Sequence, residues 1–146
     1  MVIYCAFLKE LARKLKNKME FEKKRGTKYN LDLNPRPFNA IKAGTKKVEG
    51  RVPTDWDRTA YSEMKPGDII SFTNNETGEV LEVVVRFVHH YKTLEKMLKI
   101  EGVLNVSSSS TTIEGSIQSY LQLEGYAKNL PKYGIYAIGV VPIVNL

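Results

Sequence analysis

The strongest constraint on the fold is the alternation of short strand-like and short helical segments from residue 29 onward. Alternating and β-branched patterns predict strands at 29–33, 46–51, 69–73, 80–88 and 133–143. Helical patterns predict three short helices, at 35–44, 93–100 and 114–123. This order predicts an α+β fold, a small mixed β-barrel of about five to six strands with short helices covering its ends. A doubly wound sheet is excluded because it needs regular helices between parallel strands.

Capping and anchoring residues mark the boundaries of these segments. Asn34 is predicted to cap a helix that starts at Pro35, and Gly44 is predicted to end it. The polar stretch 53–66 has no regular pattern, and Trp56 and Tyr61 are its expected anchors. Between two predicted helices, a run of small hydroxyl residues at 107–112 is expected to form a flexible loop.

All of the net positive charge lies at the beginning of the chain. Residues 1–28 hold nine Lys and Arg against three Glu, a net charge of +6, whereas residues 29–146 hold 13 charges of each sign. We therefore predict two regions, a basic N-terminal helical extension over 1–28 and a domain over 29–146. Because the domain is neutral, a case for nucleic-acid binding has to rest on particular residues in it.

The basic extension has the pattern of an amphipathic helix, and Gly26 is its predicted stop. The apolar side chains of its stripe are Tyr4, Leu8, Leu11, Leu15 and Met19. Three interpretations stay open: the helix packs on the domain, it binds phosphates or an anionic surface, or it precedes a true start at Met19. Residues 1–28 are also a candidate surface for a protein partner.

Length and composition limit the number of domains, the cellular location and the cofactors that we expect. A chain of 146 residues is one domain's worth, and no apolar run approaches the roughly 18–20 residues that cross a bilayer, so no membrane partner is expected. The one cysteine, Cys5, cannot form an internal disulfide and is expected to be buried, and a reducing, cytoplasmic location follows. His89 and His90 point to opposite faces of a strand, so we expect no metal site and no cofactor.

The densest group of chemical functions is Gly44-Thr45-Lys46-Lys47-Val48-Glu49-Gly50-Arg51. On a strand that starts at Lys46, alternate side chains share a face, so Glu49 and Arg51 are predicted neighbours. Lys46 joins them only if the chain bends near Gly50, as a β-bulge would allow. Such a group can bind a phosphate or a base edge, or it can lower the pKa of the lysine for catalysis. A surface ion-pair cluster is the alternative.

This octet resembles the G-x-K-x-x-E-x-R signature of ASCH domains, the activating-signal-cointegrator homology family. Four further blocks follow the order and spacing of that family and extend the resemblance over residues 29–143. These blocks are Leu31-Asp32-Leu33-Asn34 followed by Pro35, Phe38 and Ile41; Lys65-Pro66-Gly67-Asp68-Ile69-Ile70-Ser71-Phe72; Tyr91 with Leu94, Met97, Leu98 and Gly102; and Tyr133-Gly134-Ile135-Tyr136-Ala137-Ile138.

The resemblance implies a PUA-like fold, a small and partly open β-barrel with a cleft beside the octet. It also implies that RNA or a cytidine-like nucleoside binds in that cleft, with Lys46, Glu49 and Arg51 at the floor. Lys47 is a further candidate ligand-binding residue. Tyr120 and the hydroxyl run are candidates for the rim, where they would stack on a base or donate hydrogen bonds.

Some members of the family are amidohydrolases that remove the acetyl group from N4-acetylcytidine. The resemblance therefore implies an alternative function, deacetylation of an N4-acylated cytidine, with Lys46, Glu49 and Glu101 as catalytic residues. Those enzymes carry Thr at the position of Glu49, and a carboxylate beside Lys46 tends to keep the lysine charged. Both points favour binding over catalysis. A protein-interaction module is the second alternative.

Overall fold

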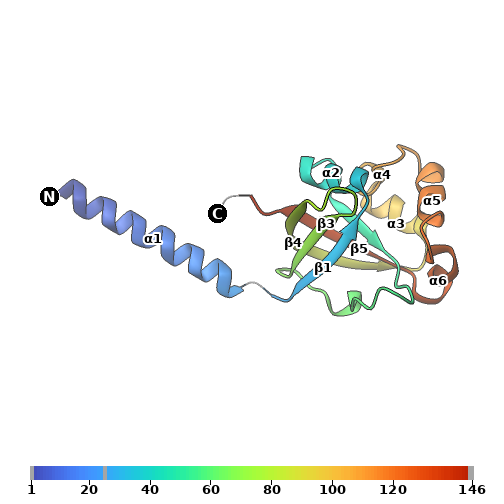
Figure 1. Cartoon of the computed structure of the whole chain (residues 1–146), viewed down its shortest axis with the longest axis horizontal. Coiled ribbons are helices and arrows are strands. Elements are labelled where there is room, and N and C mark those ends of the chain that lie inside the picture. The colour runs from blue at the N-terminus through green and yellow to red at the C-terminus, as the bar shows by residue number, and fades with distance from the viewer. Residues whose placement is uncertain (1, 25, 145–146) are drawn as a thin grey trace.

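Five strands form one curled sheet, a half-barrel, with short helices packed around it (Figure 1). The structure is a computed structural model that describes residues 2–24 and 26–144. The strands are β1 (Lys28–Leu33), β2 (Val48–Arg51), β3 (Ile69–Asn74), β4 (Val80–Tyr91) and β5 (Ile135–Pro142). The helices are α1 (Val2–Lys24), α2 (Pro35–Ala43), the 3₁₀-helix η1 (Tyr61–Glu63), α3 (Leu94–Glu101), α4 (Val103–Val106), α5 (Ile113–Leu121) and α6 (Tyr126–Tyr133). The expected α+β fold with a small mixed β-barrel is confirmed, and its five strands form an open half-barrel.

The strand order places an opening between β1 and β2. The order across the sheet is β1-β3-β4-β5-β2, with β1 parallel to β3 and every other pair antiparallel. A bulge at Arg86 increases the curl of β4 opposite β5. Because β1 and β2 are the two ends of the sheet, the half-barrel is open between them. Helix α2 connects these two strands in the sequence and lies beside the opening.

Apolar side chains on the two faces of the sheet form two core clusters. One cluster fills the half-barrel and includes Phe38 and Ile41 of α2 with Ile70 and Phe72 of β3. The other lies between the sheet and helices α3 to α6, and Met97 is fully buried in it. Strand β5 contributes to both clusters, which agrees with the prediction of an apolar, interior strand near the C-terminus. The second cluster packs α5 against β2, through Tyr120 and Val48, at one side of the opening.

Helix α1 extends away from the half-barrel (Figure 1). The predicted helix is confirmed, but its apolar side chains at Tyr4, Phe7 and Met19 are 60–66% exposed. The structure therefore does not support the interpretation in which this helix packs on the domain. The expectation of a buried Cys5 is wrong for the same reason, since its side chain is exposed on α1. In the described parts of the chain, no helix is both long and apolar enough to cross a membrane.

The boundaries of α2 agree with the sequence, although one capping contact differs. Gly44 ends the helix in the left-handed conformation, with φ of 83°, which a residue with a side chain rarely adopts. Asn34 occupies the N-cap position but makes no capping hydrogen bond with its side chain. Its Oδ1 instead accepts a hydrogen bond from Nδ2 of Asn75, at 2.7 Å. The side chain thus ties the start of α2 to the hairpin between β3 and β4.

Three short helices were absent from the prediction, η1, α4 and α6. Helix α4 is a single turn, too short to show a helical period in the sequence. Helix α6 contains Pro131, which normally argues against a helix interior. It occupies Tyr133, so β5 begins at Ile135 rather than at Tyr133.

Candidate functional site

A cleft of about 950 Å³ lies at the opening of the half-barrel. Its walls come from the end of β1 and the start of α2, from β2, from the loop after α4, from the end of α5 and from the loop that leads into α6. The lining residues are Asp32, Leu33, Asn34, Pro35, Arg36, Pro37, Lys46, Glu49, Gly50, Arg51, Trp56, Asn75, Val106, Ser107, Ser108, Ser109, Ser119, Tyr120, Gln122, Leu123, Glu124 and Tyr126.

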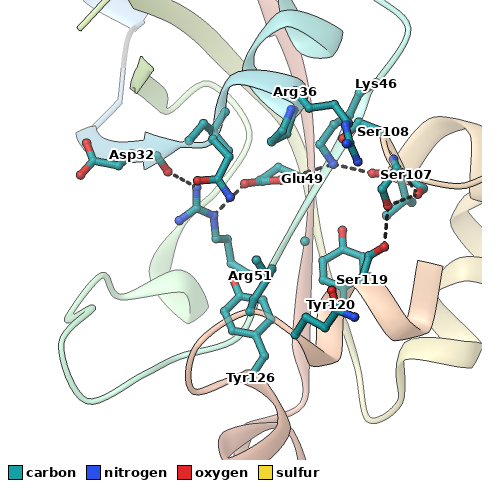
Figure 2. A pocket seen from close by; sticks show the side chains of 18 of the residues that line it. Asp32, Arg36, Lys46, Glu49, Arg51, Ser107, Ser108, Ser119, Tyr120 and Tyr126 are labelled. Carbon is teal, nitrogen blue, oxygen red and sulfur yellow. Dashed lines mark hydrogen bonds and ion pairs between the residues drawn. The ribbon is translucent and has the colours of Figure 1, made fainter. Parts of the chain in front are cut away.

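Three charged side chains lie side by side across the floor of this cleft (Figure 2). The Nζ of Lys46 lies 3.3 Å from Oε1 of Glu49, and Nε of Arg51 donates to Oε2 of the same carboxylate at 2.8 Å. The side chains of Lys46 and Glu49 are only 3% and 7% exposed. Both carboxylate oxygens are therefore held by cations, and the floor carries one more positive than negative charge.

Lys46 is held by three acceptors. In addition to Glu49, its Nζ donates to the carbonyl of Val48 at 2.7 Å and to the carbonyl of Val106. An ammonium group has three N–H donors, so these contacts use all of them. A neutral amine would have to turn its lone pair toward an oxygen, which would be unfavourable. The contacts therefore favour a charged lysine with no free N–H for a ligand.

Arg51 also spans the opening between the two ends of the sheet. Its Nη2 donates to the carbonyl of Asp32, on β1, at 2.8 Å, while its Nε holds Glu49 on β2. Nη1 has no hydrogen-bond partner among the residues that the structure describes. Because the guanidinium is planar and carries five N–H donors, the remaining ones can serve a ligand in the cleft.

Burial and charge act against each other in the pKa values of this group. Burial holds the pKa of Lys46 below its ordinary value, and the nearby Glu49 carboxylate offsets only part of that effect. Burial alone would raise the pKa of Glu49, but the charges of Arg51 and Lys46 outweigh it and hold this pKa below the ordinary value of 4.5. Burial acts to lower the pKa of Arg51, but Glu49 and the neighbouring phenols outweigh burial and raise this pKa above its ordinary value. Glu49 and Arg51 are therefore an ion pair at neutral pH.

Lys46 reaches Glu49 without the bulge that the sequence suggested. Strand β2 starts at Val48, not at Lys46, and pairs with β5 in continuous register from Val48 to Arg51. Lys46 therefore lies in the segment between α2 and β2, where strand alternation does not determine its direction. Its side chain reaches forward along the chain to the Val48 carbonyl and Glu49.

Two of the predicted site residues lie outside this cleft. Lys47 is exposed and lines an adjoining shallow hollow with Thr45 and Asn105. Glu101 does not line the cleft either. Its carboxylate accepts a hydrogen bond from the Tyr91 hydroxyl at 2.5 Å and lies 2.8 Å from Nδ1 of His89.

The Glu101 cluster is a separate structural group. Burial, followed by Glu101, raises the pKa of Tyr91 to about 12, so the phenol is neutral and can donate. Within the described residues, no group of three His, Cys, Asp or Glu side chains is placed to hold a metal ion. The Glu101 carboxylate is engaged with Tyr91 and His89, away from the group formed by Lys46, Glu49 and Arg51.

Tyr120 and part of the hydroxyl run do lie at the cleft. Tyr120 is buried in the second core cluster and lines the cleft as well, so both of the roles considered for it have a structural basis. Residues Ser107, Ser108 and Ser109 form one wall, and the Ser109 hydroxyl donates to that of Ser119 at 2.8 Å. Hydrogen bonds thus hold the hydroxyl run in place, in contrast to the flexible loop that the sequence predicted.

Among the cleft residues that sequence reasoning did not place there are Arg36, Trp56, Tyr126 and Asp32. Arg36 belongs to the first turn of α2 and faces the cleft above the floor (Figure 2). Trp56 was expected to anchor its loop, but it is 60% exposed at the cleft. A cation two residues after a predicted N-cap was the available signal for Arg36. Nothing in the local pattern placed Trp56 or Tyr126 there.

Comparisons with known proteins show the family of this chain. The family model of the ASCH domain matches residues 31–144. The chain belongs to the ASCH domain family. No curated protein matches the chain.

Two solved structures are similar to this ASCH protein. The crystal structure of the hypothetical protein PH0355 has 36% sequence identity and a TM-score of 0.68, and the match covers 80% of this chain and 100% of that chain. The solution NMR structure of protein PF0455 from Pyrococcus furiosus has 33% identity and a TM-score of 0.63, with 82% of this chain and 100% of that chain covered.

Proposed function

We propose that this ASCH protein binds single-stranded RNA and holds one unstacked base against Arg51 in the cleft. The observation that carries the proposal is the ion-paired floor, in which Glu49 fixes the Arg51 guanidinium and leaves Nη1 for a ligand. A fixed guanidinium suits two acceptors in one plane, such as those on a base edge. Sequence-specific RNA recognition commonly uses unstacked bases of single strands.

The size of the cleft favours a strand of RNA over a free nucleoside. Its volume of about 950 Å³ lies at the upper end of the range for small-ligand sites. The exposed indole of Trp56 at the rim offers a stacking surface for a neighbouring base.

The charges that line the cleft point to base recognition more than to phosphate binding. Three cations, Arg36, Lys46 and Arg51, are balanced by three carboxylates, Asp32, Glu49 and Glu124. A groove that followed the RNA backbone would carry an excess of positive charge. We therefore expect a shallow salt dependence, with about one phosphate contact at the exposed Arg36 and a slope of about −0.7 for a single strand.

The amidohydrolase alternative has less support. A catalytic lysine needs an amine that is neutral part of the time and free to approach the substrate. The three acceptors around Lys46 favour its charged form, and Glu101 lies outside the cleft. Incubation with N4-acetylcytidine tests the alternative directly. We expect no cytidine to form, and turnover that is lost in Lys46→Ala would favour the enzyme.

Fluorescence anisotropy with labelled single-stranded RNA oligonucleotides tests the binding proposal. We expect Arg51→Lys to weaken binding about tenfold, because a lysine cannot hold Glu49 and present a planar donor pair at the same time. Arg36→Ala, at an exposed position that the fold does not need, should weaken binding about fivefold. Arg86→Ala is the matched control, since Arg86 is exposed on β4 away from the cleft lining. Equal affinities for all four proteins would refute the site.

A further inference from the structure

Helix α1 presents an apolar stripe to solvent. The six large apolar side chains of the stripe, all 45–66% exposed, are Tyr4, Phe7, Leu8, Leu11, Leu15 and Met19. A helix that packs on nothing has only marginal stability in water, because most helical stability in proteins comes from burying an apolar face. Residues 2–24 are nevertheless helical throughout. The stripe therefore calls for a surface that covers it.

Most basic side chains of α1 border the stripe or occupy the opposite face. At 3.6 residues per turn, the six apolar residues occupy an arc of about 120°. Lys9 and Arg13 lie on the far side of the helix, Lys14 lies along one border of the arc and Lys16 beyond the other, while Lys18 falls within the arc. Lysines at a border can bury their methylene groups next to apolar surface and keep the ammonium in water.

Charge selects among the surfaces that would cover the stripe. Helix α1 has seven Lys and Arg against three Glu, a net charge of +4. In a dimer formed through the stripe, two helices of net charge +4 would lie together and repel each other. RNA would pair with the bases but leave the apolar stripe in water. An anionic lipid surface satisfies both faces, because the acyl boundary takes the stripe and the head groups attract the bases.

We propose that α1 lies flat in the head-group region of membranes that contain anionic phospholipids and tethers the ASCH domain to them. This is interfacial binding without a spanning segment, so it is compatible with the absence of a membrane-crossing helix in the described residues. The ASCH family match begins at residue 31, so α1 lies outside it. The proposal does not depend on RNA binding in the cleft.

Co-sedimentation of the full chain with vesicles tests this proposal. One set of vesicles is phosphatidylcholine alone, and the other is phosphatidylcholine and phosphatidylglycerol in equal parts. We expect the protein to bind only the anionic vesicles, and the binding to weaken as salt is raised. Arg36→Ala, which alters the cleft, should bind these vesicles as the unmodified protein does.

Two variants with the same charge change separate the stripe from general electrostatics. Leu11→Glu places a carboxylate in the stripe, and Asn17→Glu places one on the exposed polar side of α1. We expect Asn17→Glu to lower the partition coefficient about fivefold, the effect of one charge. Leu11→Glu should lower the partition coefficient at least tenfold further than Asn17→Glu does, because it also removes a leucine that the membrane would bury.

Several results would overturn the proposal. These are no sedimentation with anionic vesicles, equal sedimentation with neutral ones, or equal losses in the two variants. Self-association in solution that Leu11→Glu abolishes would assign the stripe to a second copy. An RNA affinity that falls more in Leu11→Glu than in Asn17→Glu would assign it to RNA.

Discussion

At the scale of single residues, the floor of the cleft depends on how Lys46 is satisfied. Moving an ammonium group out of water costs several kcal/mol, and the cost is recovered only where each donor finds an acceptor. Lys46 meets this condition with two backbone carbonyls and Glu49. The Val106 carbonyl belongs to α4, so the same lysine also ties this single-turn helix to β2. Lys46 is thus a structural residue of the site, and Arg51 is its ligand-facing cation.

Replacing Lys46 tests this role with its sequence neighbour as the control. Lys46→Met removes one of the two cations that hold Glu49, and it leaves the carbonyls of Val48 and Val106 without their donor. We therefore expect the free energy of unfolding to fall by about 3–5 kcal/mol. Lys47→Met makes the same chemical change at an exposed position and should alter stability by less than about 0.5 kcal/mol. Urea unfolding monitored by circular dichroism measures both. A similar effect of the two substitutions would mean that Lys46 is not held as described.

At the scale of elements, the position of α5 against β2 depends on one close contact. A Cβ at Gly50 would lie 2.6 Å from the Tyr120 hydroxyl and 3.1 Å from Cδ1 of Ile135. Both neighbours are buried in the second core cluster and have little room to move. The glycine therefore lets α5 approach β2 closely enough for Tyr120 to reach the cleft.

A double-mutant cycle tests this contact. Gly50→Ala should destabilise the protein by about 1–3 kcal/mol, because α5 or β2 has to shift to accept the methyl group. Tyr120→Phe removes the nearest atom of the clash, so Gly50→Ala should cost less in the Tyr120→Phe background. The two substitutions should then be non-additive by about 0.5 kcal/mol or more. Additive losses in chemical unfolding would place the strain elsewhere.

At the scale of the whole molecule, the site lies where the half-barrel fails to close. Strands β1 and β2 end the sheet without pairing with each other, and Arg51 spans the gap with one hydrogen bond to the Asp32 carbonyl. This hydrogen bond holds the two ends of the sheet together, and the ion pair with Glu49 fixes the arginine that makes it. Acid that neutralises the Glu49 carboxylate should therefore weaken the whole fold.

This coupling predicts how stability depends on pH. The folded-state pKa of Glu49 lies below 4.5, the ordinary value, so its stabilisation is complete above that pH and is lost as the pH falls through the folded pKa. We expect the free energy of unfolding to decline below about pH 4.5. The decline should be shallower in Glu49→Gln, with a remainder from Asp57, whose pKa is also lowered. Glu76→Gln, at an exposed hairpin position, is the control, and a slope equal to that of Glu49→Gln would contradict the prediction.

The local pattern of the sequence determined the elements and the chemical content of the site. Periods of two and 3.6 residues identified all five strands and helices α1, α2, α3 and α5, since these periods follow from which face each element buries. The octet and the four further blocks identified the family before any contact was known. Helix α6 was not predicted, because Pro131 inside it argues against a helix.

Only the tertiary structure decided which of these side chains meet. Lys46 contacts the Val106 carbonyl across 60 positions, and Arg51 contacts the Asp32 carbonyl across 19, so no local period could place them together. The same packing left Glu101 and Lys47 outside the cleft and brought Arg36 into it. Periodicity fixes the face of one element, whereas a site depends on how several elements pack, and that is settled by the shape of the two cores and the opening between β1 and β2.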